Sequence, residues 1–206
     1  MKIHHTFLPV ILLFSVLCTI SGFRSADSGN YAIRWVLLKG GSLQVLGSTN
    51  VNKFTCAITG YGNFDTITVY KTTAENQPIP LKGMLSLDVS LFDCRNPIMT
   101  GDLRKTLKAK AFPKLKIRFI NLNRFPSFAP QNNPIKGVVD IELAGVSRRF
   151  DVSYTFSKDE QRTIHLLGER FVNFSDFNLI PPRKLGGMIQ TEDRLKVQFE
   201  LSIKSI

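Results

Sequence analysis

Period-two alternation of apolar and polar residues recurs along most of this chain. Residues 114–119 read Lys-Leu-Lys-Ile-Arg-Phe, so every second residue is apolar and the others are cations. Similar alternation occupies residues 85–91, 139–143, 150–156 and 197–203. The pattern predicts half-buried strands, because successive side chains of a strand point to opposite faces of a sheet. The sequence therefore indicates an all-β chain.

One segment has a helical period instead. Between Met99 and Ala111 two leucines lie four residues apart, with basic residues between them. We expect a short helix there, with Thr100 or Asp102 as its N-cap and Pro113 ending it. The rest of the chain predicts no second helix.

Eight or more antiparallel strands must protect the edges of their sheet. Closure into a barrel removes the edges, and a sandwich of two sheets is the alternative. About eight strands enclose an interior that side chains fill or that holds one small ligand. We expect a single barrel, with a long strand from Leu81 to Phe92, a tight turn at Ala144-Gly145 and a bulge at Gly168.

The N-terminus has the composition of a secretory signal peptide. Lys2 and two histidines precede an apolar run from Phe7 to Ile20, and small residues follow. The run is shorter than the roughly 20 apolar residues that cross a bilayer. We expect a signal peptide over residues 1–22, one domain over residues 30–206, and a periplasmic or secreted location.

Export determines how the cysteines are interpreted. Removal of the signal leaves Cys56 and Cys94. An oxidising compartment favours a disulfide between them over a redox or metal pair, and two buried free thiols are the alternative. The bridge would close a loop of roughly forty residues and contribute about 4 kcal/mol in the chain-entropy model.

The formal net charge of +11 limits the classes of partner. A basic exported protein can meet anionic lipid surfaces, polyanionic cell-wall polymers or acidic substrates. Nucleic acid is not an expected partner outside the cytoplasm. Solvation of the barrel exterior is the simplest role for most of the Lys and Arg residues.

The residue types argue against catalysis and metal binding. His165 is the only histidine of the mature chain, and no Gly-x-Ser-x-Gly motif is present. Nucleophilic catalysis usually needs a base beside the nucleophile, and zinc sites need several Cys and His at fixed spacings. We therefore expect neither an enzyme nor a metal site.

The inward-facing apolar residues can either pack against one another or line a cavity. The 16 phenylalanines favour a cavity, because ligand pockets have aromatic walls with few polar groups. If the helix covers one end of the barrel, nearby cations can attract an acidic head group. The cations in question are Arg104, Lys105, Lys108, Lys110 and Lys114.

Several segments occur in a characteristic order. They are residues 42–54, before the first glycine-rich turn; residues 87–92, 99–108 and 112–119, a strand, a helix and a "P-x-I-x-F"-like strand; residues 136–149, a "G-x-L-x-I-x-G-V-x-R"-like hairpin; and the closing segment, residues 171–179. In order and spacing these segments resemble the YceI-like family of exported lipid-binding proteins.

The resemblance implies a lipocalin-like antiparallel β-barrel of about eight strands with one short inserted helix. Its tunnel would hold a long isoprenoid chain, such as a polyprenyl quinone or polyprenyl phosphate, with no catalysis and no other cofactor. Two departures are visible. Thr49-Asn50-Val51 replaces the family's His-Leu-Gly, and Asp176-Phe177-Asn178 replaces its Asp-Phe-Gly.

We expect non-enzymatic binding of an isoprenoid or similar amphiphilic lipid in the barrel, for transport, storage or envelope stress. The alternative is an exported barrel with a filled core that acts through its basic surface. The oligomeric state is not indicated by the sequence. The residues expected to line the tunnel or its mouth are Leu85, Leu87, Val89, Leu103, Leu107, Leu115, Ile117, Phe119, Val152, Tyr154, Phe156, Phe174 and Phe177.

Overall fold

The computed structural model describes residues 32–63, 65–70, 77–128 and 134–206, and the expected signal peptide lies outside them. The strands are β1 (Ala32–Leu37), β2 (Gly41–Ser48), β3 (Lys53–Tyr61), β4 (Thr66–Tyr70), β5 (Ile79–Asp88), β6 (Lys114–Leu122), β7 (Ile135–Leu143), β8 (Val146–Lys158), β9 (Ile164–Asn173), β10 (Arg183–Lys184), β11 (Ile189–Gln190) and β12 (Arg194–Ser205). The helices are α1 (Pro97–Thr106) and the 3₁₀ turns η2 (Val89–Leu91), η3 (Ser175–Phe177) and η4 (Leu185–Gly187).

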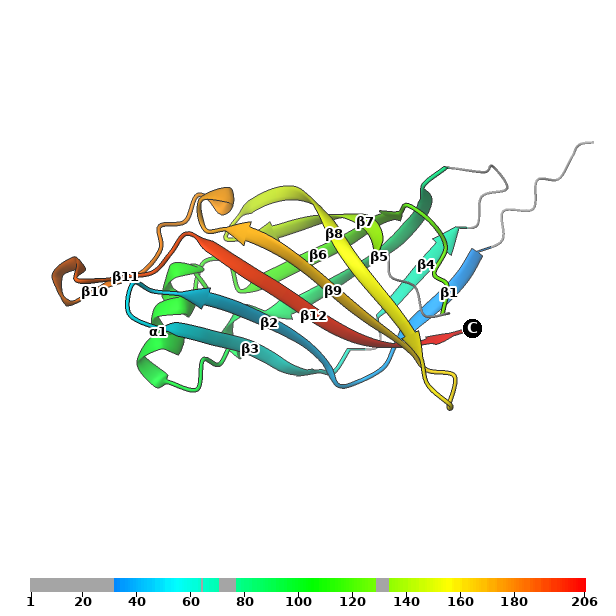
Figure 1. Ribbon diagram of the computed structural model, residues 1–206, viewed down its shortest axis with the longest axis horizontal. Coiled ribbons are helices and arrows are strands. Elements are labelled where there is room, and N and C mark those ends of the chain that lie inside the picture. Colours follow the sequence, from blue (N-terminus) through cyan, green and yellow to red (C-terminus); the bar gives the residue numbers. More distant parts are fainter. Residues whose placement is uncertain (1–31, 64, 71–76, 129–133) are drawn as a thin grey trace, which may run out of the picture.

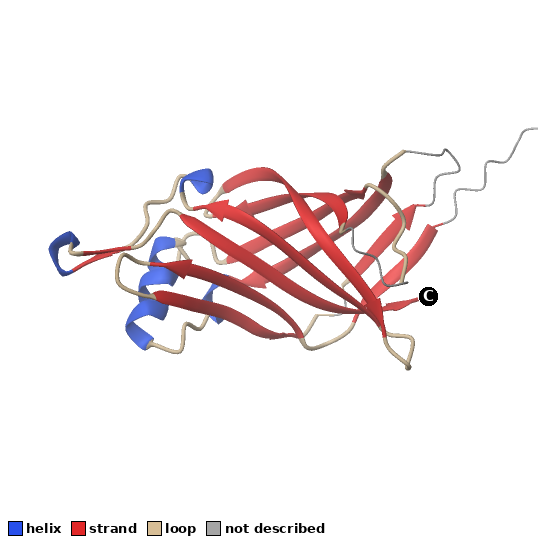
Figure 2. Ribbon diagram, in the orientation of Figure 1, coloured by secondary structure: helices blue, strands red, loops and turns tan. Residues whose placement is uncertain are grey.

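Of the described strands, all but β10 and β11 form one closed antiparallel barrel (Figure 1), and β10 and β11 form a separate two-stranded sheet. β1 and β2 both pair with β12, β1 near its C-terminal end and β2 in its N-terminal half, so together they occupy one position in the barrel. β3 and β4 likewise pair with β2 and β1. With β5, β6, β7, β8, β9 and β12 this gives eight strand positions. The predicted all-β barrel with an inserted α-helix is confirmed, and Figure 2 shows that strands dominate the fold.

Alternation along each strand separates the core from the surface. In β6, Leu115, Ile117 and Phe119 are buried, whereas Lys116 and Arg118 point outward. Lys116 pairs with Glu142 of the neighbouring β7 at 2.9 Å. The cations of this strand therefore belong to the solvated outer face, as the period of two predicts.

A group of aromatic rings, the aromatic plug, fills the barrel interior beside β1. Its rings belong to Trp35, Tyr154, Phe156 and Phe199, with centroid separations of 5.8 Å for Trp35–Phe156, 6.2 Å for Tyr154–Phe156 and 5.9 Å for Tyr154–Phe199. All four side chains are buried. The interior at this end is therefore packed core.

Gly168 makes room for the aromatic plug. On three adjacent strands Tyr154, Gly168 and Phe199 lie in register, and neither pairing of β9 shows a shift. A Cβ at Gly168 would lie 2.3 Å from Cζ of Phe199, so the missing side chain allows the neighbouring rings to meet. The predicted bulge at Gly168 is therefore wrong, because the glycine is needed for space and leaves the strand pairing unbroken.

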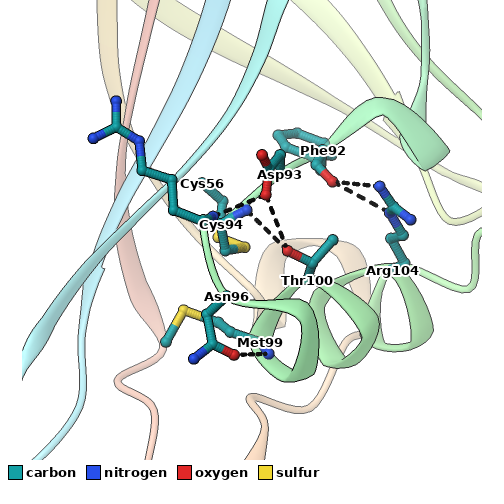
Figure 3. Close-up of a disulfide and its surroundings, with 9 residues drawn as sticks. Cys56, Phe92, Asp93, Cys94, Asn96, Met99, Thr100 and Arg104 are labelled. Carbon is teal, nitrogen blue, oxygen red and sulfur yellow. Dashed lines mark hydrogen bonds between the residues drawn. A yellow bond between two sulfur atoms is a disulfide. The ribbon is translucent and has the colours of Figure 1, made fainter.

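The opposite end of the barrel is closed by α1 and a disulfide. Among the described strands β3 pairs only with β2, so its other edge lacks a strand. Ala57 of β3 instead exchanges two backbone hydrogen bonds with Asp93, and the adjacent Cys56 is bonded to Cys94 (Figure 3). The predicted disulfide is present in the structure, and it ties the start of α1 to the edge of the barrel.

The helix is shorter than predicted and begins earlier. Its N-cap is Asn96, whose side chain accepts a hydrogen bond from the Met99 N–H at 3.0 Å, and Pro97 occupies the first turn. Thr100 and Asp102 therefore do not cap the helix. It ends at Thr106 because Lys108 adopts a left-handed conformation, and the following N–H groups bond back to the last carbonyls. In the described part of the chain no helix is long and apolar enough to cross a membrane.

Two further predictions have different outcomes. The strand expected to reach Phe92 stops at Asp88, where the chain enters η2 and turns Leu91 out to solvent. The hairpin turn Ala144-Gly145 is confirmed, with both residues at positive φ. Such values suit a two-residue connection, because they match the twist of the flanking strands.

Candidate functional site

An apolar cavity, partly open to solvent, lies between α1 and the barrel strands. Its volume is about 70 Å³, and every lining residue except Asn173 is apolar. Leu103 of α1 and Leu107, which directly follows the helix, form one wall, and Leu43 of β2 and Val197 of β12 lie on another. Six residues predicted to contact ligand line this cavity: Leu103, Leu107, Leu115, Ile117, Phe174 and Phe177.

The other seven predicted ligand residues are buried but line neither this cavity nor the groove described below. Tyr154 and Phe156 belong to the aromatic plug, and Phe119 packs against Phe199 at a centroid distance of 6.5 Å. The remaining four pack in the core; they are Leu85, Leu87, Val89 and Val152. Their contact with a ligand stays a prediction.

The cavity is too small for a long chain. An engineered protein cavity of about 150 Å³ binds one benzene molecule, which is roughly twice the volume seen here. Beside β1 the interior is packed by the aromatic plug. A long isoprenoid therefore fits at this cavity only if side chains of the cavity wall or of the plug move.

A larger groove opens at the same end of the barrel. It has a volume of about 270 Å³ and lies between α1, the turn joining β2 to β3, and the β10–β11 hairpin. Leu103 and Phe174 line both the groove and the apolar cavity. These two side chains therefore form a wall that the groove and the cavity share.

Polar contacts hold the groove together. Lys184 of β10 pairs with Asp102 of α1 at 2.5 Å, which bridges the hairpin and the helix. On the other side, Asn50 exchanges hydrogen bonds with Gln190 and donates to the Met188 carbonyl at 2.8 Å. The hairpin is thus fixed to both α1 and the β2–β3 turn.

This groove is not evident from the sequence. There, Asn50 and Val51 stand out only as a departure from a family pattern. The Asn96-Pro97 pair was the one available signal for the helix start, because Asn is a favoured N-cap and Pro a favoured first helical residue. The contacts across the groove join residues 140 positions apart, and local patterns do not reveal them.

The basic cluster divides into residues with different roles. Arg104 donates two hydrogen bonds to the Phe92 carbonyl (Figure 3), and Lys114 pairs with Asp88. Lys105, Lys108 and Lys110 are exposed. The structure therefore places two cations of the predicted cluster in local contacts and three in solvent.

Polar residues on the outer wall form one further group. His165 Nε2 lies 3.1 Å from Asp159 and Nδ1 lies 3.4 Å from the Ser202 hydroxyl. None of these three residues lines the cavity or the groove. Asp159 also accepts a hydrogen bond from the Thr163 N–H, so the group fixes the turn between β8 and β9. In the described residues no three His, Cys, Asp or Glu side chains gather where a metal could bind.

Comparison with known proteins agrees with this architecture. A family model described as "YceI-like domain" matches residues 41–203. The crystal structure of BcnA from Burkholderia cenocepacia is similar with a TM-score of 0.58 and 14% identity, over 79% of this chain and 95% of BcnA. A polyisoprenoid binding domain from Saccharophagus degradans, implicated in plant cell wall breakdown, has a TM-score of 0.55 and 11% identity, over 84% of this chain and 98% of that domain. No curated protein sequence matches significantly.

Proposed function

Since the chain belongs to the YceI-like domain family, we propose that it binds the apolar chain of an amphiphilic lipid of the polyisoprenoid class, without catalysis. The proposed location is the periplasm or the extracellular space. The observation that carries the proposal is the apolar cavity behind α1, because its wall faces a groove that opens to solvent. A similar barrel from Saccharophagus degradans is described as a polyisoprenoid binding domain, which supports the ligand class.

The energetics favour an apolar ligand. Each CH₂ group transferred from water to the cavity contributes about 0.8 kcal/mol. Leu103 and Phe174 separate groove and cavity, so rotation of these side chains gives a chain access to the interior. A long chain must then displace part of the aromatic plug, which lowers its net affinity by the packing that is lost.

The proposal is tested by lipid retention. The purified protein is incubated with a polyprenol and separated from free lipid, and bound polyprenol is quantified by mass spectrometry. Leu107→Phe fills the cavity and is expected to lower retention several-fold, whereas Leu91→Phe, at an exposed position outside the cavity and groove, leaves it unchanged. Absence of retained polyprenol in the wild-type protein would reject the proposal.

A second candidate function is supported by the aromatic plug. A barrel whose interior is packed by Trp35, Tyr154, Phe156 and Phe199 can act through its basic exterior on an anionic envelope polymer. Such binding would weaken as salt rises and would be unchanged by Leu107→Phe. The two functions are thus separated by the same cavity-filling variant.

A further inference from the structure

Exposed apolar side chains gather at the α1 end of the barrel. The β10–β11 hairpin projects beyond the barrel at this end (Figure 1), and Leu185 and Met188 at its tip are 65% and 70% exposed. Val51 and Ile98, at 64% and 71% exposure, line the groove beside the hairpin. Single exposed apolar residues are common, but a group at the mouth of a groove indicates a contact surface.

The hairpin presents these side chains from a fixed backbone. Asn50 and Asp102 hold its two strands, as described above. At the tip Leu185, Gly186 and Gly187 all have positive φ. A positive φ is favourable for glycine but unfavourable for leucine. The turn therefore holds the exposed Leu185 in a backbone conformation that leucine disfavours. Burial in an apolar phase would offset that cost.

The charged residues around the tip of the β10–β11 hairpin indicate which kind of partner surface it contacts. Residues 183–190 include Arg183 and Lys184 and no acidic residue, and residues 95–110 include five cations and only Asp102 as an acid. Arg183 makes no ion pair within the described part of the chain. Together with a formal net charge of +11, these cations favour approach to a negatively charged surface.

We propose that this end of the barrel docks on an anionic lipid bilayer. Leu185 and Met188 enter the interfacial region, Arg183 contacts lipid phosphates, and the groove mouth faces the bilayer. The docking stands on the exposed residues alone. Its link to lipid transfer rests on the proposed function, because a chain leaving the bilayer would meet the groove and then the wall formed by Leu103 and Phe174.

Vesicle co-sedimentation tests the docking. The protein is mixed with vesicles of phosphatidylcholine alone or of phosphatidylcholine and phosphatidylglycerol in equal parts. We expect binding to the anionic vesicles, weakened roughly tenfold in Leu185→Ser/Met188→Ser, since tenfold corresponds to about 1.4 kcal/mol of lost burial. Met84→Ser/Leu167→Ser removes exposed apolar residues from the barrel wall and should bind like the wild type. Circular dichroism verifies that each variant is folded.

The outcomes separate docking from ligand binding. The docking surface would be rejected if Leu185→Ser/Met188→Ser bound the anionic vesicles as tightly as Met84→Ser/Leu167→Ser does. It would also be rejected if the wild-type protein bound neutral and anionic vesicles equally. The polyprenol retention assay is run on the same proteins. Retention without wild-type vesicle binding would reject docking and leave the proposed function standing, whereas vesicle binding without retention would support docking and reject the proposed function.

Discussion

At the scale of single residues, the packing of the barrel interior depends on the Tyr154 hydroxyl and on the absence of a side chain at Gly168. The Tyr154 hydroxyl is buried with no hydrogen-bond partner among the described residues, and burial raises the pKa of Tyr154 well above its usual range. Its ring meets Phe199 over Gly168. The aromatic plug thus combines good packing with one unsatisfied group, which lowers the free energy needed to open it.

Tyr154→Phe is expected to stabilise the protein. The substitution keeps the ring and removes a hydroxyl whose desolvation is not compensated, so the free energy of unfolding should rise by about 1 kcal/mol. Urea denaturation of the wild-type and variant proteins measures the difference. A loss of stability in the variant would show that the hydroxyl has a partner in solution.

Two glycine substitutions should have opposite effects. Gly168→Ala places a Cβ 2.3 Å from Cζ of Phe199 and should destabilise the barrel by about 1–3 kcal/mol through overpacking. Gly101→Ala, in α1, meets nothing within 4 Å and should stabilise it by about 0.5–1 kcal/mol through helix propensity. Thermal unfolding compares them, and a stable Gly168→Ala protein would contradict the proposed packing.

At the scale of elements, α1 is held to the barrel by apolar contacts, capping and the disulfide. The bridge joins residues 38 positions apart, from β3 to the loop before α1. In the chain-entropy model such a loop contributes about 4 kcal/mol to stability. In the double variant Cys56→Ser/Cys94→Ser, the free energy of unfolding measured with denaturant should fall by up to this amount. The same loss should follow reduction of the wild-type protein, and no loss in either case would exclude a structural role for the bridge.

Ion pairs between neighbouring strands on the outer face predict that the stability of the protein depends on pH. Hydrogen bonds from Arg149 and Lys196 hold the carboxyl pKa values of Asp140 and Glu169 below their usual range. Because these pKa values are lowered by folding, the stabilisation is present at neutral pH and is lost as the pH falls through the native values. Denaturant unfolding between about pH 7 and about pH 2 should therefore show declining stability.

Variants of the two cations test this dependence. Arg149→Gln and Lys196→Gln remove the charges that lower the carboxyl pKa values. In each variant the free energy of unfolding should therefore decline less on acidification than it does in the wild type. Lys204→Gln, at an exposed position on the same outer surface, serves as the control. An identical decline in all four proteins would assign the pH dependence to other groups.

At the scale of the whole molecule, the sequence predicted the barrel and its helix better than the site. Alternation identifies which side chains face inward, as in β6, but does not reveal whether they pack or leave space. The cavity lies between α1 and residues of β2, β6, β7, β9 and β12. The plug forms where Gly168 lies between two aromatic residues in register. Both depend on pairing between strands distant in the sequence. The groove was missed for the same reason, since Asn50 meets Gln190 only in the folded chain.

Entry of a lipid chain into the barrel interior is tested by the fluorescence of Trp35. Trp35 is the only tryptophan in the sequence and lies in the aromatic plug, with ring centroids 5.8 Å from Phe156. During titration with a long-chain polyprenol, we expect a saturable change in Trp35 emission that is weakened in Leu107→Phe and retained in Leu91→Phe. Unchanged emission, with or without bound polyprenol, would contradict entry of the chain.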